Sequence, residues 1–214
     1  ALTAALTLGL AGCSSSGNSS TADSSATAGD STSVAESSTE GDQSLQKVKD
    51  AGQFILGLDA TFKPMGYTDE NGEIVGFDID VAEEVCNRLG VKLVKQPINW
   101  DTLTTDLNVG KCDCIWNGLS INEERQEKMN LSEPYMKNAM VFVVKGDSTV
   151  AKMDDLKGKK VSVQNGSSAQ TILENSAIKD DITISPIATN VEALQQLELG
   201  VVDAVFLDEV VAAV

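Results

Sequence analysis

The sequence has 214 residues, a net charge of −16 and no histidine. The acidic balance offers no basic stripe for a nucleic-acid backbone. The absence of histidine excludes a histidine-dependent catalytic triad and a histidine-based zinc site. We therefore expect no binding of nucleic acid, and we also expect neither a metal nor a cofactor.

Residues 1–12 are small, apolar and uncharged. Their length suits the hydrophobic region of a secretory signal peptide and is too short to span a bilayer. The basic region that should precede such a segment is missing, so we expect the sequence to begin inside the signal. A buried N-terminal helix is the alternative, and the Ser-rich tract that follows disfavours it.

The Leu-Ala-Gly-Cys run at residues 10–13 resembles the lipobox of bacterial lipoproteins, in which the cysteine is lipidated and becomes the mature N-terminus. The resemblance implies lipidation at Cys13 and an extracytoplasmic protein held at the cell membrane by its lipid anchor. Stable attachment takes two signals, such as two acyl chains.

Residues 14–44 consist almost entirely of Ser, Thr, Gly, Ala, Asn, Gln, Asp and Glu. Such a segment buries too little apolar surface to offset the conformational entropy of the chain, so we predict a disordered Ser/Thr-rich tether. The folded part then begins near Leu45, and its roughly 170 residues suffice for one domain or two small lobes.

Strands and helices alternate from residue 54 onward. Apolar residues recur at helical spacing over 78–89, with Asp80 and Glu83 as an expected capping pair and Gly90 as the stop. Asn122 is expected to cap a short helix. The other elements predicted in this half are strands at 54–58, 91–94, 112–116 and 139–144 and a helix at 101–109.

A second unit of the same kind follows. Strands are predicted at 160–164, 182–185 and 203–207, with a helix to about Asn175 and another that Asn190 caps and Gly200 ends. This alternation predicts α/β units with parallel sheets. Two such runs, joined by the apolar strand at 139–144, indicate two lobes with a cleft between them.

Three cysteines remain besides Cys13. Cys112 and Cys114 alternate within a predicted strand, and Cys86 lies on the apolar face of a predicted helix. A CxC pair without further cysteine or histidine is a poor metal site, so we interpret all three as small core residues. A disulfide between Cys86 and one of the others is the alternative in an exported protein.

In open α/β sheets, ligands bind beyond the carboxyl ends of the strands. This rule selects candidate binding segments by position alone. They are residues 59–62, which include Asp59 and Phe62; Asn99 and Trp100; residues 117–120, which are Asn117, Gly118, Leu119 and Ser120; residues 166–168, with Ser167 and Ser168; and Asp208.

Four segments carry a resemblance to a known family. They are residues 76–82 (GFDIDVA), 117–125 (NGLSINEER), 131–135 (LSEPY) and 156–168, which begins LKGKKV and ends GSS. These segments resemble the family-3 extracellular solute-binding proteins, which serve importers of polar amino acids, and the resemblance covers about residues 45–212.

The resemblance implies an α/β, two-lobe periplasmic-binding-protein-like fold (type II) that is C-terminally truncated, since relatives continue with a return strand and a last helix. The expected domains are residues 1–13 (signal region and lipobox), 14–44 (tether), 45–139 (lobe 1) and 140–214 (lobe 2, incomplete). The implied function is capture of a polar or basic L-amino acid and its delivery to the permease subunits of an ABC importer. We expect a monomer without enzymatic activity.

A zwitterionic ligand requires a cation and an anion. Arg125 suits the carboxylate because guanidinium binds it bidentately, although a solvated helix residue is the alternative. Asp208 suits the ammonium, with a helix N-cap as the alternative. Hydroxyl and backbone donors at Ser120, Ser167 and Ser168 would complete the carboxylate site.

The remaining residues concern the ligand side chain. Phe62 and Trp100 resemble positions that sandwich the side chain in relatives, with core packing as the alternative. Asp59 and Asn117 are expected to bind a polar or cationic tip, which favours arginine, lysine, histidine, glutamine or cystine over leucine and valine.

Two other function classes compete with the receptor. Some relatives are exported dehydratases of cyclic acids, and that reading requires a general acid or base near a leaving group. The third is a ligand-sensing module of a membrane receptor, for which a C-terminal transmembrane segment would be diagnostic.

Overall fold

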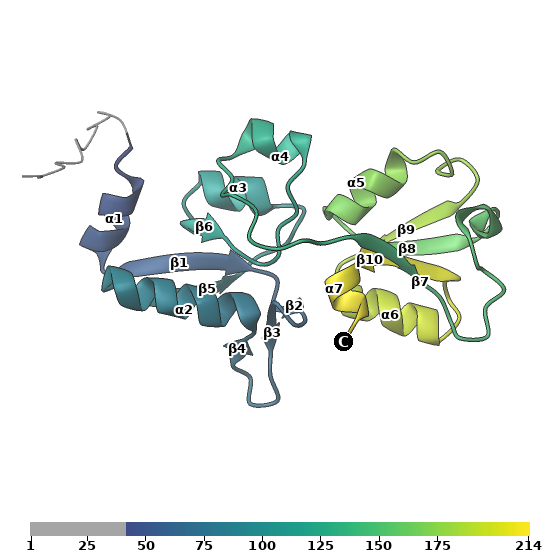
Figure 1. Cartoon of the computed structure of the whole chain (residues 1–214), viewed down its shortest axis with the longest axis horizontal. Helices are drawn as coiled ribbons and strands as arrows, with labels where there is room; N and C mark the ends of the chain where they lie inside the picture. The colour runs from purple at the N-terminus through teal and green to yellow at the C-terminus, as the bar shows by residue number, and fades with distance from the viewer. Residues whose placement is uncertain (1–41) are drawn as a thin grey trace, which may run out of the picture. The chain divides into compact units, whose positions relative to one another are not determined.

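The computed structural model describes residues 42–214 (Figure 1). The predicted signal region, Cys13 and residues 14–41 of the predicted tether lie outside the described residues. The tether is predicted to reach residue 44, but Ser44 begins helix α1 (Ser44–Ala51), a helix that no pattern in the sequence predicted. This helix ends at Gly52, whose left-handed conformation (φ 66°) is the usual C-terminal cap.

The first lobe is built on a parallel sheet with strand order β5-β1-β6. Its strands are β1 (Gln53–Leu58), β5 (Lys92–Pro97) and β6 (Cys114–Ile115). The strand predicted at 112–116 is therefore shorter than expected, and Cys112 lies outside it.

Helix α2 (Phe77–Leu89) covers one face of this sheet, since its Ile79 and Ala82 pack against Leu56 and Leu58 of β1. The predicted stop at Gly90 is confirmed (φ 72°). The predicted capping pair is wrong: the N-cap is Gly76, so Asp80 lies inside the first turn.

A small antiparallel sheet, β2-β3-β4, follows β1 and was not predicted. Its strands are β2 (Thr61–Phe62), β3 (Gly66–Thr68) and β4 (Ile74–Val75). Two short helices complete the lobe: α3 (Leu103–Asn108) and α4 (Glu123–Lys128). The predicted cap of α4 is confirmed, since Asn122 accepts a hydrogen bond from the Arg125 backbone N–H at 2.8 Å.

The second lobe contains a four-stranded sheet with strand order β7-β10-β8-β9, in which only β7 is antiparallel to its neighbour. Its strands are β7 (Met140–Val143), β8 (Lys160–Gln164), β9 (Thr183–Ile187) and β10 (Ala204–Asp208). The proposed lobe boundary at 139/140 falls directly before β7.

Helices α5 (Ser168–Glu174) and α6 (Asn190–Glu198) cover opposite faces of this sheet (Figure 1). α5 packs on the face formed by Val161, Val163 and Phe206, whereas α6 packs on the face with Val205 and Leu207. The remaining helices are a 3-10 turn at Met153–Leu156 and α7 (Glu209–Ala212).

The expected cap of α6 is corrected by one residue. Thr189 is the N-cap and its side chain accepts a hydrogen bond from Glu192 N–H, whereas Asn190 is the first helical residue. Both residue types cap helices well, so the local pattern did not separate them.

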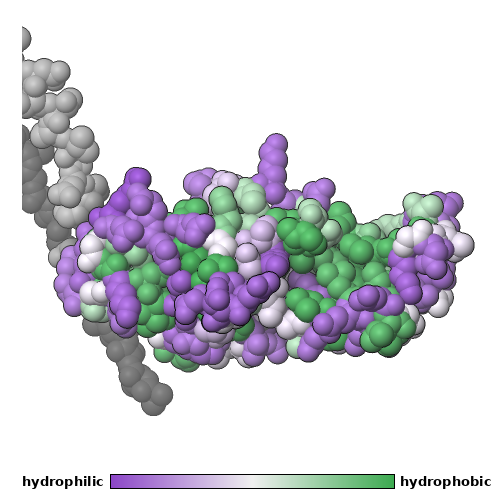
Figure 2. Space-filling model, turned by 90° about the horizontal axis from the view of Figure 1, so that it is seen from below, coloured by the Kyte–Doolittle hydropathy of each residue, from purple (hydrophilic) through white to green (hydrophobic). Residues whose placement is uncertain are grey.

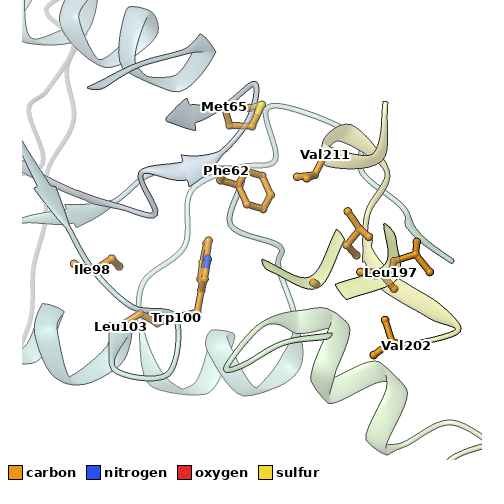
Figure 3. Packing of buried hydrophobic residues seen from close by; sticks show 11 residues of the cluster. Phe62, Met65, Ile98, Trp100, Leu103, Leu197, Val202 and Val211 are labelled. Atoms are coloured by element: carbon orange, nitrogen blue, oxygen red, sulfur yellow. The ribbon is translucent and has the colours of Figure 1, made fainter. Parts of the chain in front are cut away.

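An apolar cluster joins the two lobes (Figure 3). From the first lobe it takes Phe62, Met65, Ile98, Trp100 and Leu103, and from the second it takes residues of α6, β10 and α7, among them Leu197 and Val211. The interface between the lobes is therefore itself a packed core.

Hydrophilic side chains are mixed with hydrophobic ones on the face shown in Figure 2. Within residues 42–214, no helix is long and apolar enough to cross a membrane. Cys86, Cys112 and Cys114 are free thiols, with Cys86 and Cys112 buried as expected for core residues and Cys114 partly buried.

Candidate ligand-binding site

A small cavity lies between the lobes, at the carboxyl ends of their strands. It is lined by most of the residues that the sequence singled out and by two others, Met140 and Gln164. The complete lining is Phe62, Trp100, Gly118, Ser120, Arg125, Met140, Gln164, Ser167, Ser168 and Asp208. Its volume is about 10 Å³, which is room for about one water molecule.

Arg125 is buried in this cavity although it sits on the short helix α4. One guanidinium nitrogen, Nη1, donates to the Ser120 carbonyl and to Ser168 Oγ, both at 2.8 Å. The guanidinium also lies 5.5 Å from the centre of the Trp100 ring. Burial lowers the pKa of Arg125, and the charges of Asp208 and Glu124 oppose that shift.

Asp208 ends β10 and is buried in the same cavity. Its Oδ1 accepts a hydrogen bond from Asn138 Nδ2 at 2.5 Å. Burial raises the pKa of this carboxyl, and the Asn138 hydrogen bond and the Arg125 charge counteract the rise. Asp208 occupies the N-cap position of α7, but its side chain makes no capping hydrogen bond.

Neither charge is paired. Among the residues that the structure describes, no ion pair includes Arg125 or Asp208. Buried charges are costly unless a counter-charge accompanies them. The cavity is therefore suited to a small molecule that carries both an anionic and a cationic group.

The two serines lie at the start of α5. Ser167 is its N-cap: its hydroxyl accepts from Gln170 N–H at 3.1 Å and donates to the Gln164 carbonyl at 2.7 Å. Ser168 Oγ accepts from Arg125 and, at 3.3 Å, from Asn122 Nδ2. Ser168 thus links the second lobe to the guanidinium of the first.

The rings of Phe62 and Trp100 lie 6.2 Å apart at an angle of 59°. Both line the cavity, and both belong to the apolar cluster between the lobes. The tilted contact between the two rings is core packing, and the side-chain sandwich stays a prediction.

Asp59 and Asn117 are buried but do not line the cavity. The Asn117 Oδ1 accepts from the Asp59 backbone N–H at 3.1 Å, whereas its Nδ2 has no partner among the described residues. Asn117 instead borders a second hollow of about 1190 Å³, whose lining combines apolar residues such as Phe54, Phe77 and Trp116 with polar and charged ones.

Two successive hydrogen bonds, from Gly118 to Tyr135 and from Tyr135 to Asp78, connect the cavity wall to α2; we call them the relay. Tyr135 Oη accepts from the Gly118 N–H at 3.1 Å and donates to Asp78 Oδ1 at 2.9 Å. Asp78 is fully buried at the start of α2, and burial raises the pKa of its carboxyl. The relay therefore ties the cavity wall to α2.

No cluster of three or more potential metal ligands of the His, Cys, Asp or Glu type occurs within residues 42–214. Arg125 and Asp208 are the only ionisable residues of the cavity lining. What the lining offers chemically is a set of donors and acceptors, two opposite charges and two aromatic rings.

Residues 54–196 match the bacterial extracellular solute-binding proteins, family 3. The chain belongs to this family. The fold class predicted from the sequence is confirmed, because solved two-lobe amino-acid-binding proteins resemble it closely. One is the substrate-binding protein of an ABC uptake transporter from Streptococcus pneumoniae with bound histidine, at 37% identity and a TM-score of 0.78 over 82% of this chain and 73% of that one.

Two further relatives are an amino-acid-binding protein and an ancestral binding protein that preceded an enzyme. The L-cystine-binding protein TcyJ of Escherichia coli K12 is 30% identical over 170 residues, which are 78% of this chain and 63% of TcyJ. The chain thus spans less than two thirds of the length of this curated relative. The ancestral amino acid-binding protein AncCDT-1, a precursor of cyclohexadienyl dehydratase, is 34% identical with a TM-score of 0.74, over 79% of this chain and 75% of that one.

Proposed function

We propose that this chain captures a polar or basic L-amino acid between its lobes and delivers it to the permease of an ABC importer. The observation that carries the proposal is the pair of buried, unpaired and opposite charges, Arg125 and Asp208, on one cavity. An amino acid brings a carboxylate for the first and an ammonium for the second. Each ligand group would pair with one of these side chains and so offset the desolvation cost of its buried charge.

The relatives support the amino-acid class. One is a cystine-binding protein and another holds histidine. Both ligands have polar side chains, which agrees with a cavity that adds an amide, hydroxyls and aromatic rings to the two charges.

Ligand entry requires the lobes to separate. The cavity of about 10 Å³ is far too small for an amino acid, and Arg125 uses its Nη1 to bind Ser168 across the lobes. We infer that the described arrangement is a closed one and that opening exposes the guanidinium for the ligand carboxylate.

We infer that the chain is not an enzyme. The relation to a dehydratase precursor keeps an elimination reaction as the competing function. Such a reaction needs an acid or base beyond the groups that hold the substrate. The cavity offers only Arg125 and Asp208 as ionisable groups, and the amino acid occupies both.

The placement of the protein is proposed from the sequence. Lipidation at Cys13 would anchor it outside the cytoplasmic membrane, with residues 14–44 as the tether and the importer as its partner.

A Cys13→Ala variant of the full chain should move from the membrane to the soluble fraction, whereas Ser14→Ala should not. A Cys13→Ala protein that stays membrane-bound contradicts the lipid anchor.

The function is tested by a thermal-shift screen of the twenty amino acids and cystine, followed by calorimetry on those that raise the melting temperature. Arginine, lysine, histidine, glutamine and cystine should rank above leucine and valine. Binding of none of them contradicts the proposed function, whereas conversion of a cyclic acid by the purified protein would favour the enzyme.

A further inference from the structure

Gln164 lines the cavity and was not among the residues that the sequence singled out. It ends β8 and is almost fully buried. Its Nε2 donates to Ala188 O at 3.1 Å, and its Oε1 accepts from Asn190 Nδ2 at 3.2 Å. The second lobe therefore fixes the orientation of this amide, with one N–H left to point across the cleft.

That N–H is bound to Asp59 of the first lobe. The distance from Gln164 Nε2 to Asp59 Oδ2 is 2.7 Å. The same oxygen accepts from Trp100 Nε1 at 3.0 Å, and Oδ1 accepts from the backbone N–H and the hydroxyl of Thr61 at 2.8 and 2.6 Å.

Four donors thus occupy the roughly four acceptor positions of the Asp59 carboxylate. Three come from its own lobe and persist when the lobes separate; only the Gln164 donor crosses between lobes. Trp100 and Gln164 line the cavity, whereas Asp59 does not. A ligand side chain therefore meets an indole and an amide in front of the buried carboxylate.

We propose that Gln164 determines ligand specificity by occupying the last acceptor position of Asp59. A cationic side chain reaches the carboxylate only by displacing the amide. The charge-assisted hydrogen bond gained is then offset by the one lost, and a buried amide N–H is left without a partner. A neutral polar side chain needs no such exchange, because the amide itself is available as its neighbour. The inference rests on the proposed function, that the cavity binds an amino acid.

The test measures the dissociation constants of L-arginine and L-glutamine by calorimetry with the full chain. Gln164→Met keeps the length of the side chain and removes the donor. It should lower the ratio Kd(arginine)/Kd(glutamine) at least tenfold, since a hydrogen bond to a charged group contributes that much. Gln195→Met, the same change at an exposed position of α6, should leave the ratio within twofold.

Gln164→Glu is a second variant with nearly unchanged shape. It places a carboxylate against Asp59, which favours a cation between them. The ratio should fall more at pH 8 than at pH 5, because two carboxylates in contact hold a proton more readily at the lower pH. The ratio is also insensitive to a general loss of stability, which affects both ligands alike.

A tenfold fall of the ratio in either variant supports the specificity role. If the wild-type protein binds glutamine or arginine and both variants keep the ratio within threefold, the role of Gln164 is refuted and the proposed function stands. If the wild-type protein binds none of the twenty amino acids, the proposed function and the role of Gln164 fail together.

Discussion

At the scale of single residues, the site is defined by charges that the protein buries without pairing them. Arg125 is surrounded by a carbonyl, a hydroxyl and an indole ring, and Asp208 by an amide. These neutral partners reduce the cost of burial but do not cancel the charges. Within residues 42–214 the two charges have no ion-pair partner, and a zwitterionic ligand would supply a partner for each.

Arg125→Ala should weaken amino-acid binding at least ~100-fold, because a bidentate charge-assisted pair is lost and the ligand carboxylate is left buried without a partner. The fold should survive, since the change removes a buried charge that has no ion-pair partner among residues 42–214. Calorimetry gives the affinity and circular dichroism the fold. Arg88→Ala is the control, because Arg88 is exposed on α2 and, among the described residues, pairs only with Glu84. A loss below about threefold at Arg125 contradicts its role.

The raised pKa of Asp208 predicts that ligand affinity depends on pH. Its pKa is raised by burial, so the carboxyl takes up a proton at a higher pH than an ordinary aspartate, whose pKa is about 3.9. The ligand ammonium pairs only with the ionised form, so affinity should fall as the pH drops from 7 through the raised pKa. The folding stability of the ligand-free protein should have the opposite pH dependence. A carboxyl whose pKa is raised in the folded state stabilises the fold below that pKa, and this contribution is lost as the pH rises through the raised pKa.

Calorimetry between pH 4 and pH 7 checks this expectation. Asp208→Asn should bind weakly and with little dependence on pH, whereas the exposed Asp80→Asn should retain the wild-type profile. A wild-type affinity that stays constant over this range, for a ligand whose side chain does not titrate there, excludes Asp208 as the ammonium partner.

At the scale of elements, α2 supports the cavity wall although it contributes no residue to the cavity. Asp78 in its first turn binds Tyr135, which in turn accepts the N–H of Gly118. The segment that carries Tyr135, residues 129–139, contains no helix or strand. Its position therefore depends on side-chain contacts of this kind.

Tyr135→Phe should lower the free energy of unfolding by about 1–3 kcal/mol, because it leaves the buried Asp78 carboxyl and the Gly118 N–H without their shared partner. Urea denaturation measures the change. Tyr67→Phe is the matched control: its hydroxyl makes no hydrogen bond among the described residues, so its effect should stay within about 0.5 kcal/mol. Equal effects of the two substitutions would show that the relay is not stabilising.

The sequence predicted the elements whose pattern is local. Helix α2 has apolar residues at helical spacing and ends at a glycine, and β8 was predicted with its observed bounds. The sheet β2-β3-β4 was missed because strands of two or three residues show no periodicity. Gln164 was missed for another reason: it reads as the polar end of a strand, and its partner Asp59 lies 105 residues earlier in the chain.

The site residues divide in the same way. The carboxyl-end rule and the resemblance led to Arg125 and Asp208, and the structure brings both to one cavity. No sequence pattern indicates that Asp59 and Asn117 lie outside the cavity lining. The Asp59 carboxylate is held by donors from Thr61, Trp100 and Gln164, and Asn117 is held by the Asp59 backbone N–H. A single sequence does not predict the contacts between residues far apart in the chain, such as Gln164 and Asp59, that position the side chains of the site.

At the scale of the whole described unit, the closed arrangement combines apolar packing with a few polar bonds across the cleft. The apolar cluster includes residues of both lobes, and Arg125–Ser168 and Gln164–Asp59 are bonds between them. Each of these contacts is lost when the lobes separate. We infer that ligand entry breaks these contacts and that closure on the ligand restores those that the ligand leaves free.

Gly166 provides a test of closure, because it lies in the second lobe directly against the backbone of the first. A Cβ atom there would overlap the backbone nitrogen of Asp101, far inside van der Waals contact. Gly166→Ala should hold the lobes apart, weaken ligand binding at least ~10-fold and increase the radius of gyration of the liganded protein in small-angle X-ray scattering.

The left-handed backbone of Gly166 (φ +70°) adds strain in any substitution, so the control must share it. Gly158→Ala does, since Gly158 has φ +75° and no atom within 4 Å of its added Cβ. If both variants bind equally well, contact at Gly166 does not limit closure; if only Gly166→Ala loses affinity, ligand capture depends on the two lobes meeting at this glycine.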